Sequence, residues 1–287
     1  MSPLVTDAVS SGLSYLDSLI LGIVEGLTEF LPVSSTGHLT VAEKLLDLPI
    51  DDPAVTAYTA IIQVGAIAAT FLYFRHDIAR LAAAWGRGVV SAPQRQNPDY
   101  RFAWYVIAGS LPVALVGLAL RKVIEGPLRN LWVVAAALVL WSAVMWFAER
   151  RPRQDVGERQ LTLRTVLLIG VAQCAALVPG VSRSGATISA GLLQGVDRVT
   201  ATRLSFFLAI PALTGAGLLE LFKVDTKVVG WGQLGLGTLV SFVVAYASIA
   251  WLLRFVSHHK ITAFVGYRLA AGVSIAGLLL AGVIAAH

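Results

Sequence analysis

The sequence predicts an all-α polytopic membrane protein, and three observations support this fold class. Of the 287 residues, 56% are hydrophobic and only 14% are charged, whereas soluble domains carry about 25% charged residues. Two apolar segments are interrupted by polar loops. Six further stretches have the roughly 20 apolar residues that a span requires, namely 55–74, 102–120, 131–148, 204–222, 228–253 and 265–286. This composition excludes a soluble enzyme, and the net charge of +5 indicates a cationic rim against anionic lipid and no nucleic-acid partner.

The two interrupted segments have the pattern of re-entrant helix hairpins. Residues 12–31 and 165–178 each run into a loop rich in Ser and Gly, and a second apolar piece that is too short to span follows at 39–48 and 186–195. Irregular backbone at membrane depth is tolerated only where it lines a protected cavity. We therefore expect the two loops to form a site inside the protein.

The two hairpins are also similar to each other. VSSTGH at 33–38 aligns with VSRSGA at 181–186 at an offset of 148 residues, and the same offset pairs Glu25 with Gln173. Three spans follow each hairpin, and an odd number of spans reverses the orientation, so the sequence predicts an inverted-topology repeat. Each half is a re-entrant hairpin plus three transmembrane helices. The chain is then a single membrane domain with a first repeat at 1–150 and a second, inverted repeat at 151–287.

The charges of the loops predict the orientation. The loops 75–101, 149–164 and 254–260 hold twelve Lys and Arg residues, and the loops on the opposite side hold six. The positive-inside rule assigns the more basic loops to the cytoplasm. Both termini are then outside, the first hairpin enters from the outer face, and the second enters from the cytoplasm.

Two carboxylates lie in the first hairpin. Ionisable groups inside apolar segments are expensive and therefore mark functional sites by default. Glu25 and Glu29 are four residues apart, which places both on one helix face. Their mutual repulsion requires a divalent cation, an arginine or a shared proton, unless this helix face is solvated.

The loop after this helix carries hydroxyls and a histidine, at Ser34, Ser35, Thr36 and His38. Helix capping explains one of the hydroxyls. For His38, the alternative to a catalytic role is a histidine buried in the core. The start of a helix also offers free N–H groups to an anion. Because His38 is three residues beyond Ser35, one helical turn brings the imidazole to that hydroxyl. This is the pattern of a nucleophile activated by a base.

The second loop supplies the cation. Arg183 carries a permanent charge and a fork of donors that suits phosphate. Hydroxyls and a glycine surround it, namely Ser182, Ser184, Gly185 and Thr187. If the loops face each other, they form a phosphate-sized polar pocket enclosed by apolar helices, which suits a substrate with an anionic head and a lipid tail.

Three further residues stand out within the spans. Gln63 and Pro211 are related by the same 148-residue offset, and they either shape the pocket or serve span packing and kinking. Arg268 lies near the end of a span, from which its side chain can extend to the interface.

The motifs EGLTEFLPVSSTGH at 25–38 and PGVSRSGAT at 179–187 resemble the two signature motifs of the undecaprenyl-diphosphatase family, also called bacitracin-resistance proteins. The resemblance covers essentially the whole chain. It implies a bacterial plasma-membrane enzyme that converts undecaprenyl diphosphate to undecaprenyl phosphate and inorganic phosphate. This reaction recycles the lipid carrier for cell-wall synthesis and confers bacitracin resistance. The resemblance also implies a requirement for divalent cations and an active site that opens to the outer, periplasmic face.

These considerations predict the roles of individual residues. The expected catalytic residues are Glu25, Glu29, Ser35, His38 and Arg183, and the expected substrate-binding residues are Ser34, Thr36, Ser182, Ser184, Gly185 and Thr187. Ser35 is the expected nucleophile, with water as the alternative, and His38 is the proton shuttle. Glu25 and Glu29 orient His38 or bind Mg²⁺ or Ca²⁺. The expected partners are undecaprenyl diphosphate and other polyprenyl diphosphates, membrane lipids and a second copy in a homodimer, and bacitracin competes indirectly for the substrate.

A membrane transporter or lipid flippase is the alternative function. Inverted repeats with broken helices are typical of transporters, and a fold alone does not determine function. Ser35, His38 and the acid pair beside Arg183 favour an enzyme, because transport alone requires neither a nucleophile nor a base.

Overall fold

The computed structural model describes residues 13–48, 53–151, 153–221 and 230–286. Within these ranges the chain is helical, and its β-structure is an isolated bridge between Val156 and Val196. Five helices are long and apolar enough to cross a membrane, namely α3 (Pro53–Tyr73), α5 (Pro98–Ala119), α7 (Leu131–Glu149), α11 (Trp231–Val256) and α12 (Ala263–Leu280). The predicted all-α, multi-pass membrane fold is confirmed.

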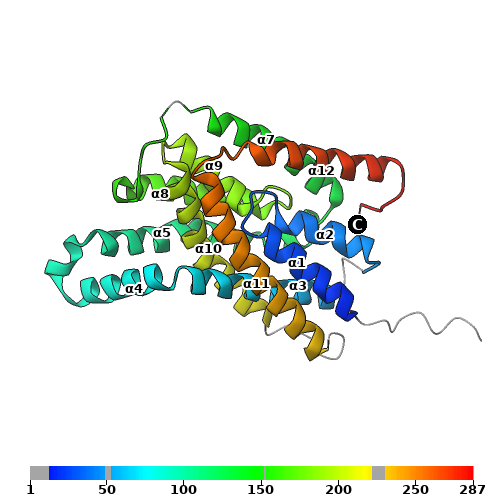
Figure 1. Ribbon diagram of the computed structural model, residues 1–287, viewed down its shortest axis with the longest axis horizontal. Coiled ribbons are helices and arrows are strands. Elements are labelled where there is room, and N and C mark those ends of the chain that lie inside the picture. Colours follow the sequence, from blue (N-terminus) through cyan, green and yellow to red (C-terminus); the bar gives the residue numbers. More distant parts are fainter. Residues whose placement is uncertain (1–12, 49–52, 152, 222–229, 287) are drawn as a thin grey trace, which may run out of the picture.

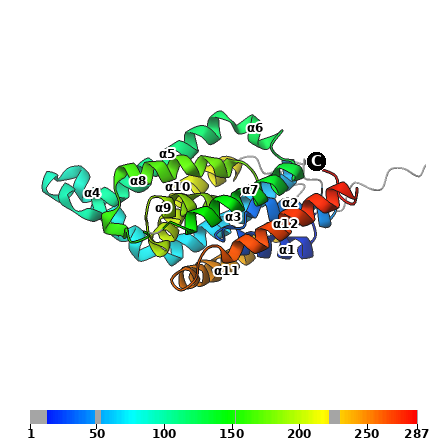
Figure 2. The ribbon, with the colours of Figure 1, turned by 90° about the horizontal axis from the view of Figure 1, so that it is seen from above.

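The sixth predicted span, 204–222, falls on α10 (Arg198–Leu221). Its last residue lies outside the described residues, as do the first two residues of the predicted span 228–253. Figures 1 and 2 show α7 and α12 side by side in both views. From above, α11 lies along one edge of the molecule and α5 along the opposite edge (Figure 2).

The two interrupted segments form helical hairpins. The first contains α1 (Tyr15–Thr28) and α2 (Ser35–Leu45), and the second contains α8 (Leu163–Gln173), the 3₁₀ helix η3 (Cys174–Leu177) and α9 (Arg183–Leu193). The helices α2 and α9 have 11 residues each, which is about half the length of a span. The short second arm predicted for each hairpin is confirmed.

The turns before α2 and α9 have nearly the same conformation. Ser34 has φ 78° and Ser182 has φ 76°, in the left-handed region that residues other than glycine seldom adopt. Each serine caps the following helix, because its hydroxyl accepts the N–H of Gly37 or Gly185. The two halves therefore repeat a strained local structure. Their inverted orientation across the whole chain stays a prediction.

Glycines related by the repeat allow the hairpins to pack closely on long helices. A Cβ atom on Gly22 of α1 would lie 2.7 Å from the carbonyl oxygen of Gly237 on α11, and one on Gly170 of α8 would lie 2.2 Å from that of Gly109 on α5. Such small-residue contacts let membrane helices approach each other at the backbone. They place each hairpin against a long helix of the other half.

The segment 75–101, predicted as a loop, is largely helical. It forms α4 (Arg75–Val90) and the 3₁₀ helix η1 (Ala92–Gln96). Leu81, Ala84 and Gly88 of α4 are buried at helical spacing, while its arginines keep the segment too polar to span. The remaining short helices are α6 (Arg121–Glu125) and the 3₁₀ helix η2 (Glu158–Gln160).

Ion pairs join the two most basic loops. Arg203 at the start of α10 pairs with Asp77 of α4 at 3.0 Å and with Glu158 of η2 at 3.4 Å. Burial raises the pKa of Asp77, but its hydrogen bonds and ion pairs with Arg80 and Arg203 outweigh this and hold the pKa below its ordinary value. Segments predicted to share one membrane face therefore lie together.

Candidate active site

A cavity of about 700 Å³ lies where the two hairpin loops meet. Its polar end includes Glu29, Ser34, Ser35, Thr36, Gln63, Ser182 and Arg183. The rest of the lining is mostly apolar and comes from α5, η3 and α10, with Val113, Ala114, Gly117, Leu118, Ala176, Leu177, Pro211, Ala212 and Leu213, while α6 adds Arg121 and Ile124. A few polar groups in a mostly apolar pocket are typical of a small-molecule site. This combination suits an amphipathic ligand.

Ser35, Glu29 and Arg183 form a hydrogen-bonded chain at the polar end. The Ser35 hydroxyl donates to Glu29 Oε2 at 2.6 Å, and Gln63 Nε2 donates to the same oxygen at 3.2 Å. Glu29 Oε1 accepts from the Arg183 guanidinium at 3.2 Å. Because both oxygens of this buried carboxylate are held, Oε2 is oriented to accept the hydroxyl proton of Ser35.

Arg183 also has a donor left for a ligand. Its guanidinium donates to the backbone oxygen of Ser205 at 2.9 Å as well as to Glu29. Its Nε is buried and has no hydrogen-bond partner within the described part of the chain. A buried donor without a partner costs free energy, and a phosphate oxygen is a partner that guanidinium groups bind well.

Glu25 lies one helical turn before Glu29 and is only 1% exposed. Neither of its carboxylate oxygens has a hydrogen-bond partner among the described residues, and the same holds for both polar atoms of the Gln173 side chain. A buried carboxylate without a partner binds a cation or a proton. The described residues contain no group of three or more His, Cys, Asp or Glu side chains that fits a metal ion. A cation beside Glu25 therefore requires further oxygen ligands from hydroxyls, amides or a phosphate.

The two loops are hydrogen-bonded to each other. The Ser34 hydroxyl accepts the N–H of Gly180 at 3.1 Å. At the corresponding place in the first loop, Pro32 has no N–H to offer, and the Ser182 hydroxyl donates instead to the Leu31 carbonyl at 3.5 Å. These contacts hold the first loop against the second at the polar end of the cavity.

Arg268 joins the same two turns, so the expectation that its side chain extends to the interface is wrong. The residue is fully buried. Its guanidinium donates to the carbonyl oxygens of Pro32 and Gly180 at 2.9 Å each, and to Ser142 Oγ at 3.3 Å. Pro32 and Gly180 are related by the 148-residue offset. A charged group this deep is tolerated because peptide carbonyls surround it.

Three residues predicted to bind substrate serve the second loop itself. Ser184 and Thr187 are buried, and Gly185 N donates to the cap residue Ser182. The Thr187 hydroxyl bonds the Ser205 hydroxyl at 2.7 Å. None of the three predicted residues lines the cavity, because each lies within α9 and its polar group is used by neighbouring parts of the chain.

The predicted contact between His38 and Ser35 is not formed. His38 Nδ1 bonds the Ser34 carbonyl oxygen at 2.7 Å, and Nε2 bonds the Tyr267 hydroxyl at 2.6 Å. Its ring also stacks on that of Tyr267 at a centroid distance of 5.5 Å. The hydroxyl of Ser35 meets Glu29 instead, because the turn at Ser34 directs the side chain of Ser35 into the cavity and that of His38 towards α12.

Gln63 and Pro211, for which pocket shaping and span packing were the alternatives, both line the cavity. The structure adds Gln173 to the lining, and Ser205 and Tyr267 as partners of site residues. A glutamine inside an apolar span, such as Gln63, can be recognised from the sequence as a candidate site residue. Ser205 and Tyr267 cannot be recognised in this way, because serine and tyrosine are ordinary residues of membrane helices and their partners lie far away in the chain.

Comparison with known proteins identifies the family of the chain. The protein-family model described as "Bacitracin resistance protein BacA" matches residues 18–274. The chain is 55% identical over 277 residues to "Undecaprenyl-diphosphatase 3" of Frankia casuarinae, which covers 96% of this chain and 100% of that protein. It is 54% identical over 275 residues to "Undecaprenyl-diphosphatase 1" of Streptomyces coelicolor, with 96% and 99% covered. It is 47% identical over 280 residues to "Undecaprenyl-diphosphatase" of Mycobacterium sp., with 96% and 100% covered. The chain belongs to the bacitracin resistance protein BacA family.

Proposed function

We propose that the protein hydrolyses undecaprenyl diphosphate to undecaprenyl phosphate and inorganic phosphate, the activity that its full-length relatives carry in their names. The observation that carries the proposal is the Ser35–Glu29–Arg183 chain at the polar end of a cavity with a mostly apolar lining. The diphosphate belongs at the polar end and the prenyl chain along the apolar lining. This reaction returns the lipid carrier to cell-wall synthesis and supports bacitracin resistance.

Phosphoryl transfer depends mainly on positioning and charge neutralisation. Arg183 holds the diphosphate through its free Nε–H and neutralises charge on the terminal phosphoryl group. Ser35 Oγ attacks the terminal phosphorus while Glu29 Oε2 accepts its proton. The bond from phosphorus to the bridging oxygen breaks, undecaprenyl phosphate leaves, and water then hydrolyses the phosphoserine to phosphate. Glu29 thus takes the base role that was first predicted for His38. In this proposal His38 instead positions the turn at Ser34.

A divalent cation such as Mg²⁺ or Ca²⁺ belongs beside Glu25 and Glu29 in this proposal. The fit rests on the two unpartnered oxygens of Glu25 and on the unpartnered amide of Gln173. Oxygen ligands are those that these cations prefer. When bound, the cation neutralises phosphate charge.

The test is phosphate release by purified protein in detergent, with farnesyl diphosphate as a soluble substrate. Ser35→Ala and Glu29→Gln should each lower the rate by about a hundredfold or more, since positioned acid–base groups contribute 10²–10⁴-fold. Ser257→Ala, at an exposed serine that does not line the cavity, is the matched control and should keep full activity. Chelation of divalent cations should suppress release, and Glu25→Gln should shift the cation titration.

Two outcomes distinguish the rival mechanisms. If Ser35→Ala stays within tenfold of the wild type, water is the nucleophile and Ser35 only a ligand. If folded protein binds the lipid diphosphate yet releases no phosphate at any cation concentration, the enzyme proposal is wrong and a lipid flippase is favoured.

We also propose a location for the protein and its site. The multi-pass fold and the family place the chain in a membrane. The twelve-to-six distribution of Lys and Arg supports a bacterial plasma membrane protein whose site faces the outside or periplasm.

A further inference from the structure

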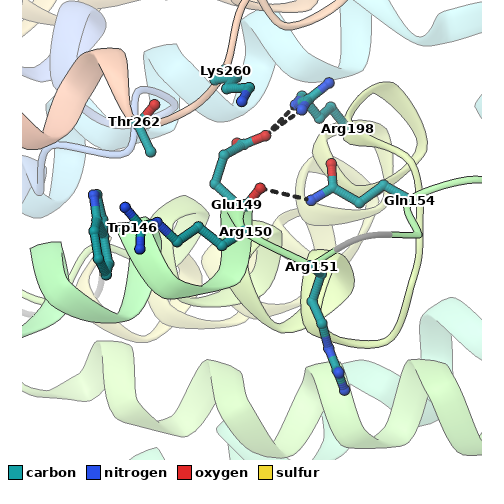
Figure 3. A pocket seen from close by; sticks show the side chains of 8 residues that line it. All are labelled: Trp146, Glu149, Arg150, Arg151, Gln154, Arg198, Lys260 and Thr262. Atoms are coloured by element: carbon teal, nitrogen blue, oxygen red, sulfur yellow. Dashed lines mark hydrogen bonds and ion pairs between the residues drawn. The ribbon is translucent and has the colours of Figure 1, made fainter.

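A second cavity of about 740 Å³ lies apart from the proposed catalytic cavity and shares no lining residue with it. It occupies the junction where α7 ends, α10 begins and α11 connects to α12. Its lining is rich in cations and consists of Trp146, Glu149, Arg150, Arg151, Gln154, Arg198, Lys260 and Thr262 (Figure 3).

Glu149 fixes the structure of this cavity. Its side chain is buried, and Oε1 pairs with Arg198 at 2.5 Å to Nε. Oε2 accepts the backbone N–H of Ile261 at 3.0 Å. Gln154 Nε2 donates to the backbone carbonyl of Glu149 at 3.4 Å (Figure 3). These contacts join the end of α7, the start of α10 and the α11–α12 connection. Both oxygens of the Glu149 carboxylate therefore have partners, and the structure around the cavity is fixed.

The remaining cations are not neutralised. Within the described part of the chain, no carboxylate pairs with Arg150, Arg151 or Lys260, all of which are exposed. The guanidinium carbon of Arg150 lies 3.4 Å from the centroid of the Trp146 ring, which holds it by a cation–π contact. Arg151 donates to the Leu193 carbonyl and points away from the other side chains (Figure 3). Arg150 and Lys260 therefore offer positive charge for an anion.

The position of the cavity along the helices indicates which anion. Glu149 ends the span α7, and Lys260 and Thr262 lie between the end of α11 and the start of α12. The ends of spans lie at the depth where hydrocarbon gives way to lipid headgroups. Trp146 is 45% exposed beside this level, as is common for tryptophan at a membrane interface. A lipid phosphate already occupies this depth, whereas a free phosphate ion has to be concentrated from water.

We propose that this cavity binds the phosphodiester headgroup of an anionic phospholipid such as phosphatidylglycerol. Arg150 and Lys260 contact the phosphate, and the ring of Trp146 lies against the glycerol and upper acyl region. A lipid headgroup and inorganic phosphate both offer anionic phosphate oxygens to these cations. The position of the cavity at the ends of the spans favours the lipid.

The experiment measures lipid retention by the full-length protein. Native mass spectrometry in neutral detergent, with increasing phosphatidylglycerol or phosphatidylcholine, counts bound lipids and gives their affinity. The wild type should retain one phosphatidylglycerol in preference to phosphatidylcholine. The double variant Arg150→Gln, Lys260→Gln should bind it about tenfold more weakly or worse, since each cation near an anionic lipid contributes substantially. The control Arg87→Gln, Arg254→Gln removes the same charge from exposed positions outside the cavity and should stay within twofold.

Three results would overturn the proposal. These are unchanged retention in the double variant, an equal loss in the control, and displacement of the lipid by inorganic phosphate at the same concentration range. Phosphate release from farnesyl diphosphate should stay within twofold in both variants, which reports an intact fold independently of the lipid. If the double variant does not fold, Lys260→Gln alone replaces it, because that amine is exposed, and the same criteria apply.

Discussion

At the scale of single residues, Arg183 provides geometry as well as charge. Its guanidinium bonds Ser205 and Glu29, and its Nε–H is buried with no partner among the described residues. An ammonium group is a compact point charge and does not reproduce this fork. The arrangement of donors is therefore the feature to test.

Arg183→Lys should lower kcat/KM for phosphate release by about a hundredfold, comparable to the loss of one donor that stabilises transition-state charge. The unfolding temperature should change little. Arg87→Lys on the exposed surface of α4 is the control. Activity of Arg183→Lys within threefold of the wild type would show that a point charge at this position is sufficient.

Arg268 acts at the same scale but through other residues, since it bonds Pro32 and Gly180 and does not line the cavity. Arg268→Lys should leave buried carbonyl oxygens without donors, at a cost of about 1–3 kcal/mol for each such group. We expect a lower unfolding temperature and a lower kcat with little change in KM. Arg254→Lys, at an exposed position, should change none of these. Wild-type stability of Arg268→Lys would contradict the assigned contacts.

At the scale of elements, the contact between α8 and α5 depends on Gly170. Any side chain there meets the backbone of Gly109, and the backbone cannot move aside as a flexible side chain does. Gly170→Val should therefore sharply reduce the yield of folded protein and lower its unfolding temperature. Gly266→Val on α12, where a Cβ meets nothing within 4 Å, controls for the change in helix propensity. Equal effects of both substitutions would mean that propensity and not packing is responsible.

The sequence predicted these elements well and their contacts less well. Apolar length alone places the spans, and the two loop motifs place the short helices α2 and α9 within a few residues. Charge inside an apolar segment singled out Glu25 and Glu29, and of these two Glu29 lines the cavity, as does Arg183 of the second loop. The partner of His38 is 229 positions away, and the acceptors of Arg268 belong to two distant turns. No local pattern encodes such contacts, because they form only when the two hairpins pack together.

At the scale of the whole molecule, the orientation in the membrane can be measured. In a Cys174→Ser background, Lys122→Cys should react with an impermeant maleimide added to intact cells, because the positive-inside rule assigns its loop to the outside. Arg153→Cys should react only after lysis. Both positions are exposed, so access to each thiol depends on the membrane side. The reverse pattern would place the proposed catalytic cavity on the cytoplasmic face.

The buried guanidinium of Arg268 limits how far the two halves of the protein can move relative to each other. Alternating access requires one half of an inverted-repeat protein to rock against the other around a central site. Arg268 holds one turn from each half, and the Ser34 and Ser182 hydroxyls connect the same turns. Rocking the halves apart would break several of these buried hydrogen bonds together, and each polar group left without a partner would cost free energy. A locked centre of this kind suits an enzyme whose lipid enters and leaves from one leaflet.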